Sequence, residues 1–79
     1  EVISEEVLFD LIRASFNQRR KTLANGLKNY PKLRLSKEQI TKAISKANLR
    51  SDIRGEALTL EEFAELSNYI YQIQNGDGD

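Results

Sequence analysis

The side chains best suited to chemistry in this chain are the cations of one segment that contains no acid. Between Leu11 and Lys37 there is no Asp or Glu. The eight cations of this acid-free segment are Arg13, Arg19, Arg20, Lys21, Lys28, Lys32, Arg34 and Lys37. The other four cations and all twelve acids lie elsewhere, so a formal net charge of zero conceals a strongly dipolar molecule. Concentrated positive charge without internal neutralisation is typical of a surface that binds a polyanion.

The chemistry that these cations offer is phosphate binding. A guanidinium donates two parallel hydrogen bonds to a phosphate, and a lysine adds a compact positive charge. The predicted contact residues are Arg13, Arg19, Arg20, Lys21, Lys28, Lys32 and Arg34. The alternative is that they are ordinary solvated charges, with one arginine capping the carbonyls of a preceding helix.

Polar and aromatic neighbours refine this prediction. Asn17, Gln18, Thr22, Asn25 and Asn29 lie among the cations and are able to contact sugar or phosphate oxygens, although helix capping is the simpler role for each. Apart from Tyr30, little exposed aromatic surface is expected near the cations. Recognition by shape and backbone is therefore favoured over base stacking.

The composition excludes several classes of active site. The chain has no Cys and no His, which rules out disulfides, a thiol nucleophile and an imidazole base. A zinc site made of carboxylates alone would be unusual. The tail Asn75 to Asp79 resembles half of a calcium loop but lacks its closing glutamate, so no metal is expected. No apolar run reaches the roughly 20 residues that span a bilayer, so no membrane partner is expected. We predict no catalytic residue.

Hydrophobic spacing predicts an all-α fold, a small orthogonal bundle of four helices over residues 4–17, 19–29, 36–48 and 59–74. A chain of 79 residues forms one small domain, which buries only roughly 60% of its unfolded surface. The predicted inward-facing residues of the four segments are Leu8, Leu11, Ile12, Phe16, Leu23, Leu27, Tyr30, Ile40, Ala43, Ile44, Ala47, Phe63, Leu66, Ile70 and Ile73.

Capping signals define the helix ends. Ser4 is the predicted start of the first helix, and Ser36 with Gln39 and Thr59 with Glu62 form capping boxes. Asn48 is a predicted left-handed cap. A second helix that begins at Arg19 would place Arg19, Arg20 and Lys21 at its N-terminus, where backbone N–H groups already attract anions.

The segment Phe16 to Leu27, FNQRRKTLANGL, resembles the signature that opens the C-terminal domain of bacterial small-subunit (16S) rRNA adenine N6-dimethyltransferases. The resemblance begins in LFDLIRASF at residues 8–16 and resumes in ANL at 47–49 and RGEALTLEEFA at 54–64. These pieces keep the family's order and spacing over most of residues 7–70. Asn48 is a departure, because the family usually has Gly there.

This resemblance implies that residues 1–74 are a helical rRNA-binding C-terminal domain excised from a larger methyltransferase, as the absence of Met also favours, followed by a flexible tail at 75–79. The parent would use S-adenosylmethionine to dimethylate two neighbouring adenosines near the 3′ end of small-subunit rRNA. Its implied partners are the immature 30S particle and its own N-terminal catalytic domain, for a cytoplasmic monomer. The family's glycine-rich cofactor loop and aromatic Asn-Pro motif do not occur here, so this piece is expected to be inactive and to bind no cofactor.

Three other functions stay open on the sequence. An acidic face of Glu56, Glu61, Glu62 and Glu65 would suit a module that docks a ribosomal protein or the catalytic domain. A related 23S rRNA resistance methyltransferase would share the architecture. Short helices are also compatible with a helix-turn-helix DNA reader.

Arg54 and Glu56 match an R-x-E element of the family. The favoured interpretation is structural, with Arg54 paired to an acid or to helix carbonyls; an RNA contact is the alternative.

Overall fold

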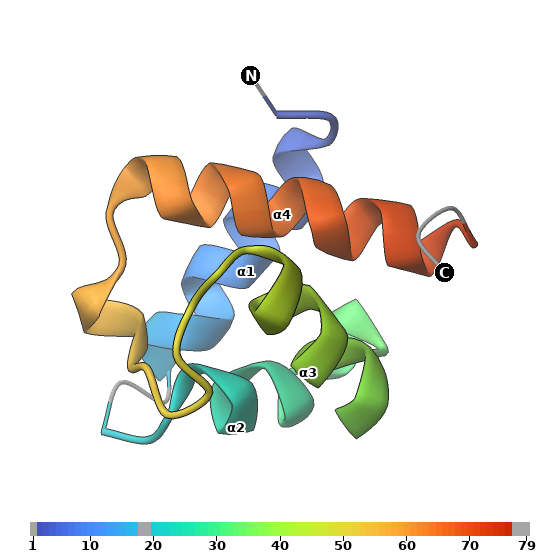
Figure 1. The fold of residues 1–79 in the computed structure, drawn as a ribbon. Coiled ribbons are helices and arrows are strands. Elements are labelled where there is room, and N and C mark those ends of the chain that lie inside the picture. Colours follow the sequence, from blue (N-terminus) through green and yellow to red (C-terminus); the bar gives the residue numbers. More distant parts are fainter. Residues whose placement is uncertain (1, 18–19, 77–79) are drawn as a thin grey trace.

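The part of the chain that the structure describes folds as four α-helices and two short 3-10 helices (Figure 1). A computed structural model describes residues 2–17 and 20–76. The α-helices are α1 (Glu5–Asn17), α2 (Leu23–Lys28), α3 (Lys37–Lys46) and α4 (Leu60–Gln74), and the 3-10 helices are η1 (Pro31–Leu33) and η2 (Gly55–Ala57). No strand occurs in these described ranges, and the predicted all-α bundle is confirmed.

The four helices pack as a ring. α1 and α3 each pack against both α2 and α4. In Figure 1 α4 crosses the top of the molecule, and α2 lies at the opposite side. The two short helices, η1 and η2, both pack against α1. Residues on α2 and on α4 therefore face different sides of the domain.

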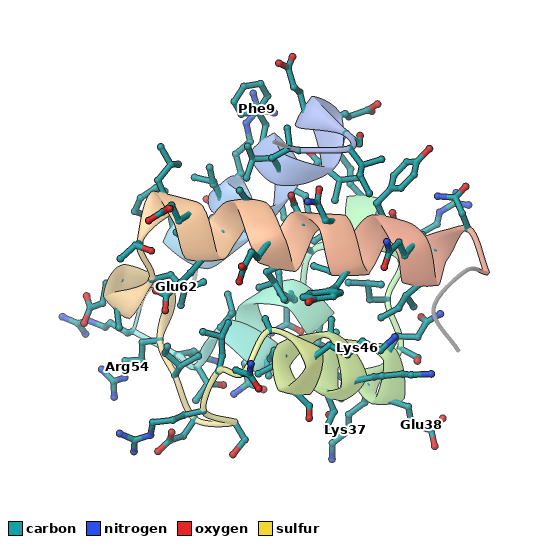
Figure 2. All side chains as sticks on the ribbon, turned by 45° about the horizontal axis from the view of Figure 1, so that its top comes forward. Phe9, Lys37, Glu38, Lys46, Arg54 and Glu62 are labelled. Atoms are coloured by element: carbon teal, nitrogen blue, oxygen red, sulfur yellow. The ribbon has the colours of Figure 1, made fainter. Side chains whose placement is uncertain are left out.

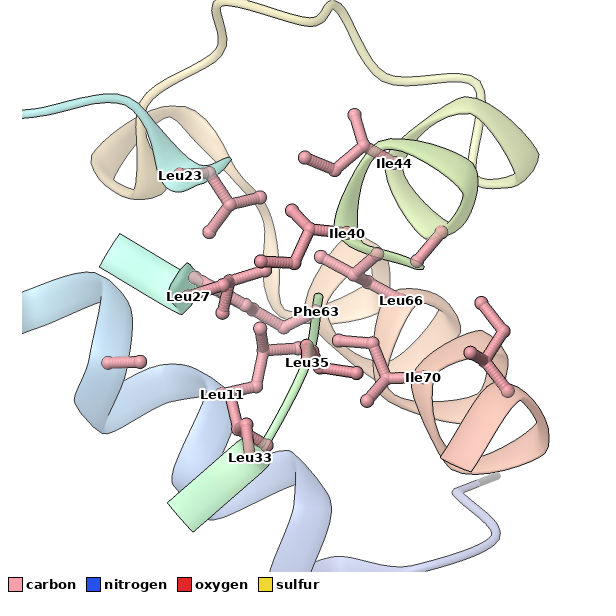
Figure 3. Packing of buried hydrophobic residues seen from close by; sticks show 13 residues of the cluster. Leu11, Leu23, Leu27, Leu33, Leu35, Ile40, Ile44, Phe63, Leu66 and Ile70 are labelled. Carbon is pink, nitrogen blue, oxygen red and sulfur yellow. The ribbon is translucent and has the colours of Figure 1, made fainter. Parts of the chain in front are cut away.

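The core fills the inside of this ring (Figure 3). Leu11, Leu27 and Leu66 have no exposed surface, and each contributes about 1.5–3 kcal/mol by leaving water. Most of the predicted inward-facing residues are confirmed as buried. They are Leu11, Leu23, Leu27, Ile40, Ala43, Ile44, Phe63, Leu66, Ile70 and Ile73.

The prediction that Phe16 lies in the core is wrong. Its side chain is 59% exposed, because the buried stripe of α1 runs through Leu11, Ala14 and Ser15 instead. The small residues Ala14 and Ser15 let other elements approach α1 closely, and Phe16 consequently turns outward. Leu8, Ile12, Tyr30 and Ala47, also predicted to face inward, are partly buried.

Both predicted capping boxes are confirmed. The Ser36 hydroxyl accepts from the Gln39 backbone N at 3.1 Å, and the Gln39 side chain accepts from the Ser36 backbone N at 2.9 Å. Thr59 and Glu62 make the same reciprocal pair at 3.1 and 2.8 Å. These bonds satisfy helix donors that have no partner inside the helix, so the starts of α3 and α4 are defined locally.

Two further caps are confirmed. The Ser4 hydroxyl accepts from the Val7 backbone N at 3.3 Å at the start of α1. Asn48 adopts the predicted left-handed conformation with φ 60° after α3. The helices themselves are Glu5–Asn17 and Lys37–Lys46, slightly shorter than the predicted 4–17 and 36–48, because the predicted ranges included the capping residues.

The predicted start of the second helix at residue 19 is wrong. Thr22 is the N-cap of α2, and its hydroxyl accepts from the Asn25 backbone N at 3.3 Å. The Leu23 backbone N donates to the Ile53 carbonyl at 2.8 Å instead of joining a longer helix. Arg20 and Lys21 therefore precede α2 and do not lie in its first turn as predicted.

α4 holds the N-terminal end of the described chain, and the last residue of α4 is bonded to η1. The Ile3 backbone N donates to Asn68 Oδ1 at 2.7 Å, and Gln74 Nε2 donates to the Leu33 carbonyl at 2.6 Å. Asn75 and Gly76, the first residues of the tail predicted to be flexible, end α4 with backbone bonds to Tyr71 and Ile73. Residues 77–79 lie outside the described ranges. None of the described helices combines the length and apolar character needed to cross a membrane.

Candidate nucleic-acid interface

The fold carries the predicted contact residues on successive elements. Arg13 lies on α1, Arg20 and Lys21 lie in the turn before α2, and Lys28 lies in the last turn of α2. Lys32 belongs to η1 and Arg34 is the residue that ends it. All six side chains are exposed. Arg19 and its neighbour Gln18 lie outside the described residues.

The exposed cations are not neutralised by the domain itself. Within residues 2–17 and 20–76, none of these six cations, nor Lys37, forms an ion pair with a carboxylate. Arg50, outside the acid-free segment, does pair with Asp52 at 3.2 Å. The positive charge of the acid-free segment is consequently available to a partner.

Acids concentrate on other elements. Glu61 and Glu62 lie in the first turn of α4, and Glu5 and Glu6 lie in the first turn of α1. There the negative charges of these side chains interact favourably with the positive end of each helix dipole. α2 and α4 lie on opposite sides of the domain (Figure 1), so the cation of α2, Lys28, and the acids in the first turn of α4 are on different sides.

Long-range backbone contacts place Arg54 beside the cations of the acid-free segment. Thr22 and Arg54 form an isolated antiparallel bridge, next to the bond from the Leu23 backbone N to Ile53. This bridge places the R-x-E element beside the turn that holds Arg20 and Lys21. No local signal predicts it, because the two segments are about thirty residues apart in the sequence.

Among the described residues, the structure does not show the predicted pairing of the Arg54 side chain with an acid or with helix carbonyls. The side chain is exposed and projects from the domain (Figure 2). It forms no ion pair with any carboxylate in the part of the chain that the structure describes. The backbone of Arg54 is the structural part: it pairs with Thr22, and its carbonyl accepts from the Ala57 N at 2.9 Å. The guanidinium remains available as a further phosphate contact.

Gly55 fixes this corner of the molecule to α1. A Cβ atom on Gly55 would lie 2.5 Å from the Cβ of Ser15. Only glycine permits this close approach. Ser15 is itself buried and donates to the Ile12 carbonyl at 2.8 Å. The glycine of the R-G-E element therefore sets the position of Arg54 relative to α1.

Arg34 is held outward by its neighbours. It adopts the left-handed conformation with φ 51°, which costs a residue other than glycine roughly 1–2 kcal/mol. Leu33 and Leu35 on either side are buried in the core. The Leu33 carbonyl is also bonded by Gln74. These anchors fix the backbone and leave the Arg34 side chain in solvent.

Exposed aromatic surface differs from the prediction. Tyr30, the expected aromatic, is partly buried, and its hydroxyl donates to Asp10 Oδ1 at 3.5 Å. Phe9 and Phe16 are instead 54% and 59% exposed. They are seven positions apart and so lie on one face of α1, with Arg13 between them. The Phe9 ring points away from the domain (Figure 2).

Comparison with known proteins gives a consistent set of relatives, although no family model matches the chain. Ribosomal RNA small subunit methyltransferase A of Lachnoclostridium phytofermentans is 60% identical over 70 residues, which cover 89% of this chain and 24% of that protein. The protein of the same name from Oceanobacillus iheyensis is 45% identical over 95% of this chain and 26% of its own length. One from Clostridium botulinum is 46% identical over 91% of this chain and 25% of its own length. The chain thus spans about a quarter of the length of these relatives.

Proposed function

The chain is a homologue of the C-terminal region of the ribosomal RNA small subunit methyltransferase A family, and we propose that it is the RNA-binding domain of such an enzyme. The observation that carries this proposal is the exposed charge of the acid-free segment. Its described cations project into solvent without a carboxylate partner among the described residues. Phosphates supply the missing counter-charge, and Arg54 extends the same surface.

The rest of the proposed activity belongs to the part of the relatives that this chain does not cover. That part would bind S-adenosylmethionine and dimethylate two neighbouring adenosines of the small-subunit rRNA. The C-terminal domain would hold the immature 30S particle in the cytoplasm while the reaction proceeds. Phosphate contacts position a protein on its nucleic acid without reading sequence, which fits this division of labour.

Charge reversal tests the proposal directly. Arg20→Glu with Lys21→Glu should weaken binding to a transcript of the 3′-terminal segment of small-subunit rRNA by at least about tenfold, since both changes replace attraction to phosphate with repulsion. Electrophoretic mobility shift or fluorescence anisotropy at fixed salt measures this loss.

A matched control is Arg50→Glu together with Lys46→Glu. It makes the same change in net charge outside the acid-free segment, at Arg50, which is already paired with Asp52, and at Lys46 on α3. Its effect should be clearly smaller. If both double variants lose affinity equally, only overall charge matters and the proposed surface is wrong.

A protein-interaction module is the second candidate. Glu56, Glu61 and Glu65 are exposed, whereas the Glu62 carboxylate caps α4 and is less available. Such a module would keep its binding after reversal of Arg20 and Lys21 and lose it after reversal of the three exposed acids.

The remaining alternatives are less favoured. The relatives reported above carry the small-subunit name, which favours that substrate over large-subunit rRNA. A helix-turn-helix reader needs a recognition helix, but α2 has six residues and a single cation, Lys28.

A further inference from the structure

A groove runs between α2 and α3, on the side of the domain away from α4. It consists of two adjoining hollows that share Ala24 and Thr41. The smaller, of about 140 Å³, is lined by Asn25 and Lys28 of α2 and by Lys37 and Thr41 of α3. The larger, of about 470 Å³, continues along Ser45, Asn48 and Ser51.

We propose that this groove binds one nucleotide unit of RNA, with a phosphate between Lys28 and Lys37 and the adjoining ribose along Thr41, Ser45 and Asn48. The inference rests on the proposed function, because it assumes that the domain binds RNA. It adds a site that the acid-free segment alone does not define, since most of the ribose side is made by residues beyond Lys37.

The phosphate end is defined by two lysines from different helices. Lys28 lies in the last turn of α2 and Lys37 is the first residue of α3, yet both line the same small hollow. Both are exposed and neither pairs with a described carboxylate. An anion between them replaces the repulsion of two ammonium groups with two attractions. Asn25 and Thr41 add neutral donors beside them.

The acid closest in sequence does not fill this position. Glu38 follows Lys37, but the two side chains point in different directions (Figure 2). Glu38 does not line the hollow shared by Lys28 and Lys37. It lines a neighbouring hollow along α3, which Lys37, Thr41 and Ser45 also line.

The ribose end is defined by the face of α3. Thr41 and Ser45 lie one turn apart on α3, and Asn48 lies in the turn after it. All three line the groove and are exposed. Ala24, Ile44 and Leu49 also line this hollow and give it an apolar part. A ribose carries hydroxyls that both donate and accept, and its 2′-hydroxyl is the group that distinguishes RNA from DNA. The hydroxyls of Thr41 and Ser45 and the amide of Asn48 likewise donate and accept hydrogen bonds, so they match the ribose hydroxyls.

The backbone closes the far end of the groove. The left-handed Asn48 turns the chain after α3, and the Leu49 backbone N donates to the Ile44 carbonyl at 3.1 Å. The Asn48 backbone N donates to the Ser45 carbonyl at 3.0 Å. The Asn48 and Ser51 side chains are therefore placed beside the groove by a fixed turn.

The first test asks whether Lys28 and Lys37 share one phosphate. Lys28→Gln, Lys37→Gln and their combination are compared in affinity for the small-subunit rRNA transcript over a range of salt. A shared phosphate predicts that the double variant is little weaker than either single variant, each weaker than wild type by roughly fivefold, and that the salt slope falls by about 0.7–0.9 in all three. The matched control combines Lys28→Gln with Lys32→Gln, whose losses should multiply. Multiplying losses for Lys28 and Lys37 would overturn the shared site.

The second test asks whether the groove recognises ribose. Thr41→Val and Ser45→Ala each remove a hydroxyl from an exposed position and should leave the melting temperature nearly unchanged. Each should reduce the preference for RNA over single-stranded DNA of the same sequence by several-fold. An unchanged preference overturns the ribose assignment. Equal competition by polyglutamate would mean that the groove accepts acidic peptides, which also overturns it.

Failure of the groove and failure of the proposed function give different results. If the domain binds RNA and Arg20→Glu weakens it while the groove variants do not, the groove alone is wrong. If wild type shows no salt-dependent RNA binding, the proposed function itself is wrong.

Discussion

Arg34, one of the predicted phosphate contacts, adopts a backbone conformation that lowers stability. Its left-handed backbone, φ 51°, is a conformation that glycine adopts more easily. The buried Leu33 and Leu35 hold the backbone there, and the Arg34 side chain is exposed with the other described cations of the acid-free segment. A residue chosen for stability alone at this position would be glycine.

Arg34→Gly should therefore separate stability from binding. We expect the free energy of unfolding to stay equal or to rise by up to about 1 kcal/mol, since relief of the left-handed strain exceeds the added entropy of glycine. Affinity for RNA should fall with the lost charge. Urea denaturation and anisotropy measure the two effects.

Lys32→Gly is the matched control, because it removes the same charge from a residue without a positive φ. It should weaken RNA binding similarly but lower stability by about 0.5–1 kcal/mol. Equal destabilisation by both variants would contradict the role given to Arg34.

At the scale of the elements, local signals were predictable from the sequence and long-range contacts were not. The capping boxes at Ser36 and Thr59 and the left-handed Asn48 depend on residues within a few positions, and all were predicted. The start of α2 was missed although its Thr22 cap, which bonds the Asn25 backbone N, is a local signal. The bond from the Leu23 backbone N to the Ile53 carbonyl spans thirty residues and was not predictable from the sequence. Periodicity likewise identified α1 as amphipathic but did not reveal that its buried face passes through Ser15 and leaves Phe16 outside.

The same difference between local signals and long-range contacts applies to the candidate interface. Composition alone located the cationic segment, since exposure is the default for lysine and arginine. The position of Arg54 beside that segment required the bridge to Thr22 and the close packing of Gly55 on α1. The roles of the predicted contact residues, Arg19 included, stay predictions until binding is measured.

Gly55→Ala tests the packing of η2 on α1. Its new methyl group would lie 2.5 Å from Ser15 Cβ, so one element must move. We expect a loss of about 1–3 kcal/mol in the free energy of unfolding, the usual cost of overpacking. Chemical denaturation measures it.

Gly76→Ala provides the comparison, because nothing lies within 4 Å of a Cβ there and only its φ of +79° opposes the change. That strain costs roughly 1–2 kcal/mol before the gain from a stiffer unfolded chain. A Gly55 variant as stable as wild type would show that the close approach to Ser15 is not a constraint.

For the whole molecule, the central feature is a separation of charge that a net charge of zero conceals. Twelve cations and twelve acids balance in number, yet eight of the cations share one acid-free segment. The ring of helices puts α2 and the turn before it on one side and α4 with its acids on another (Figure 1). The domain therefore carries concentrated positive charge while staying neutral overall.

The salt dependence of RNA binding tests this claim most directly. Affinity of the wild-type chain for the small-subunit rRNA transcript is measured by anisotropy from low to moderate salt. If about five phosphates are neutralised, the logarithm of affinity should fall against the logarithm of salt concentration with a slope of about −3.5 to −4.5. A slope near zero would show that the cations do not meet an RNA backbone and would contradict the account.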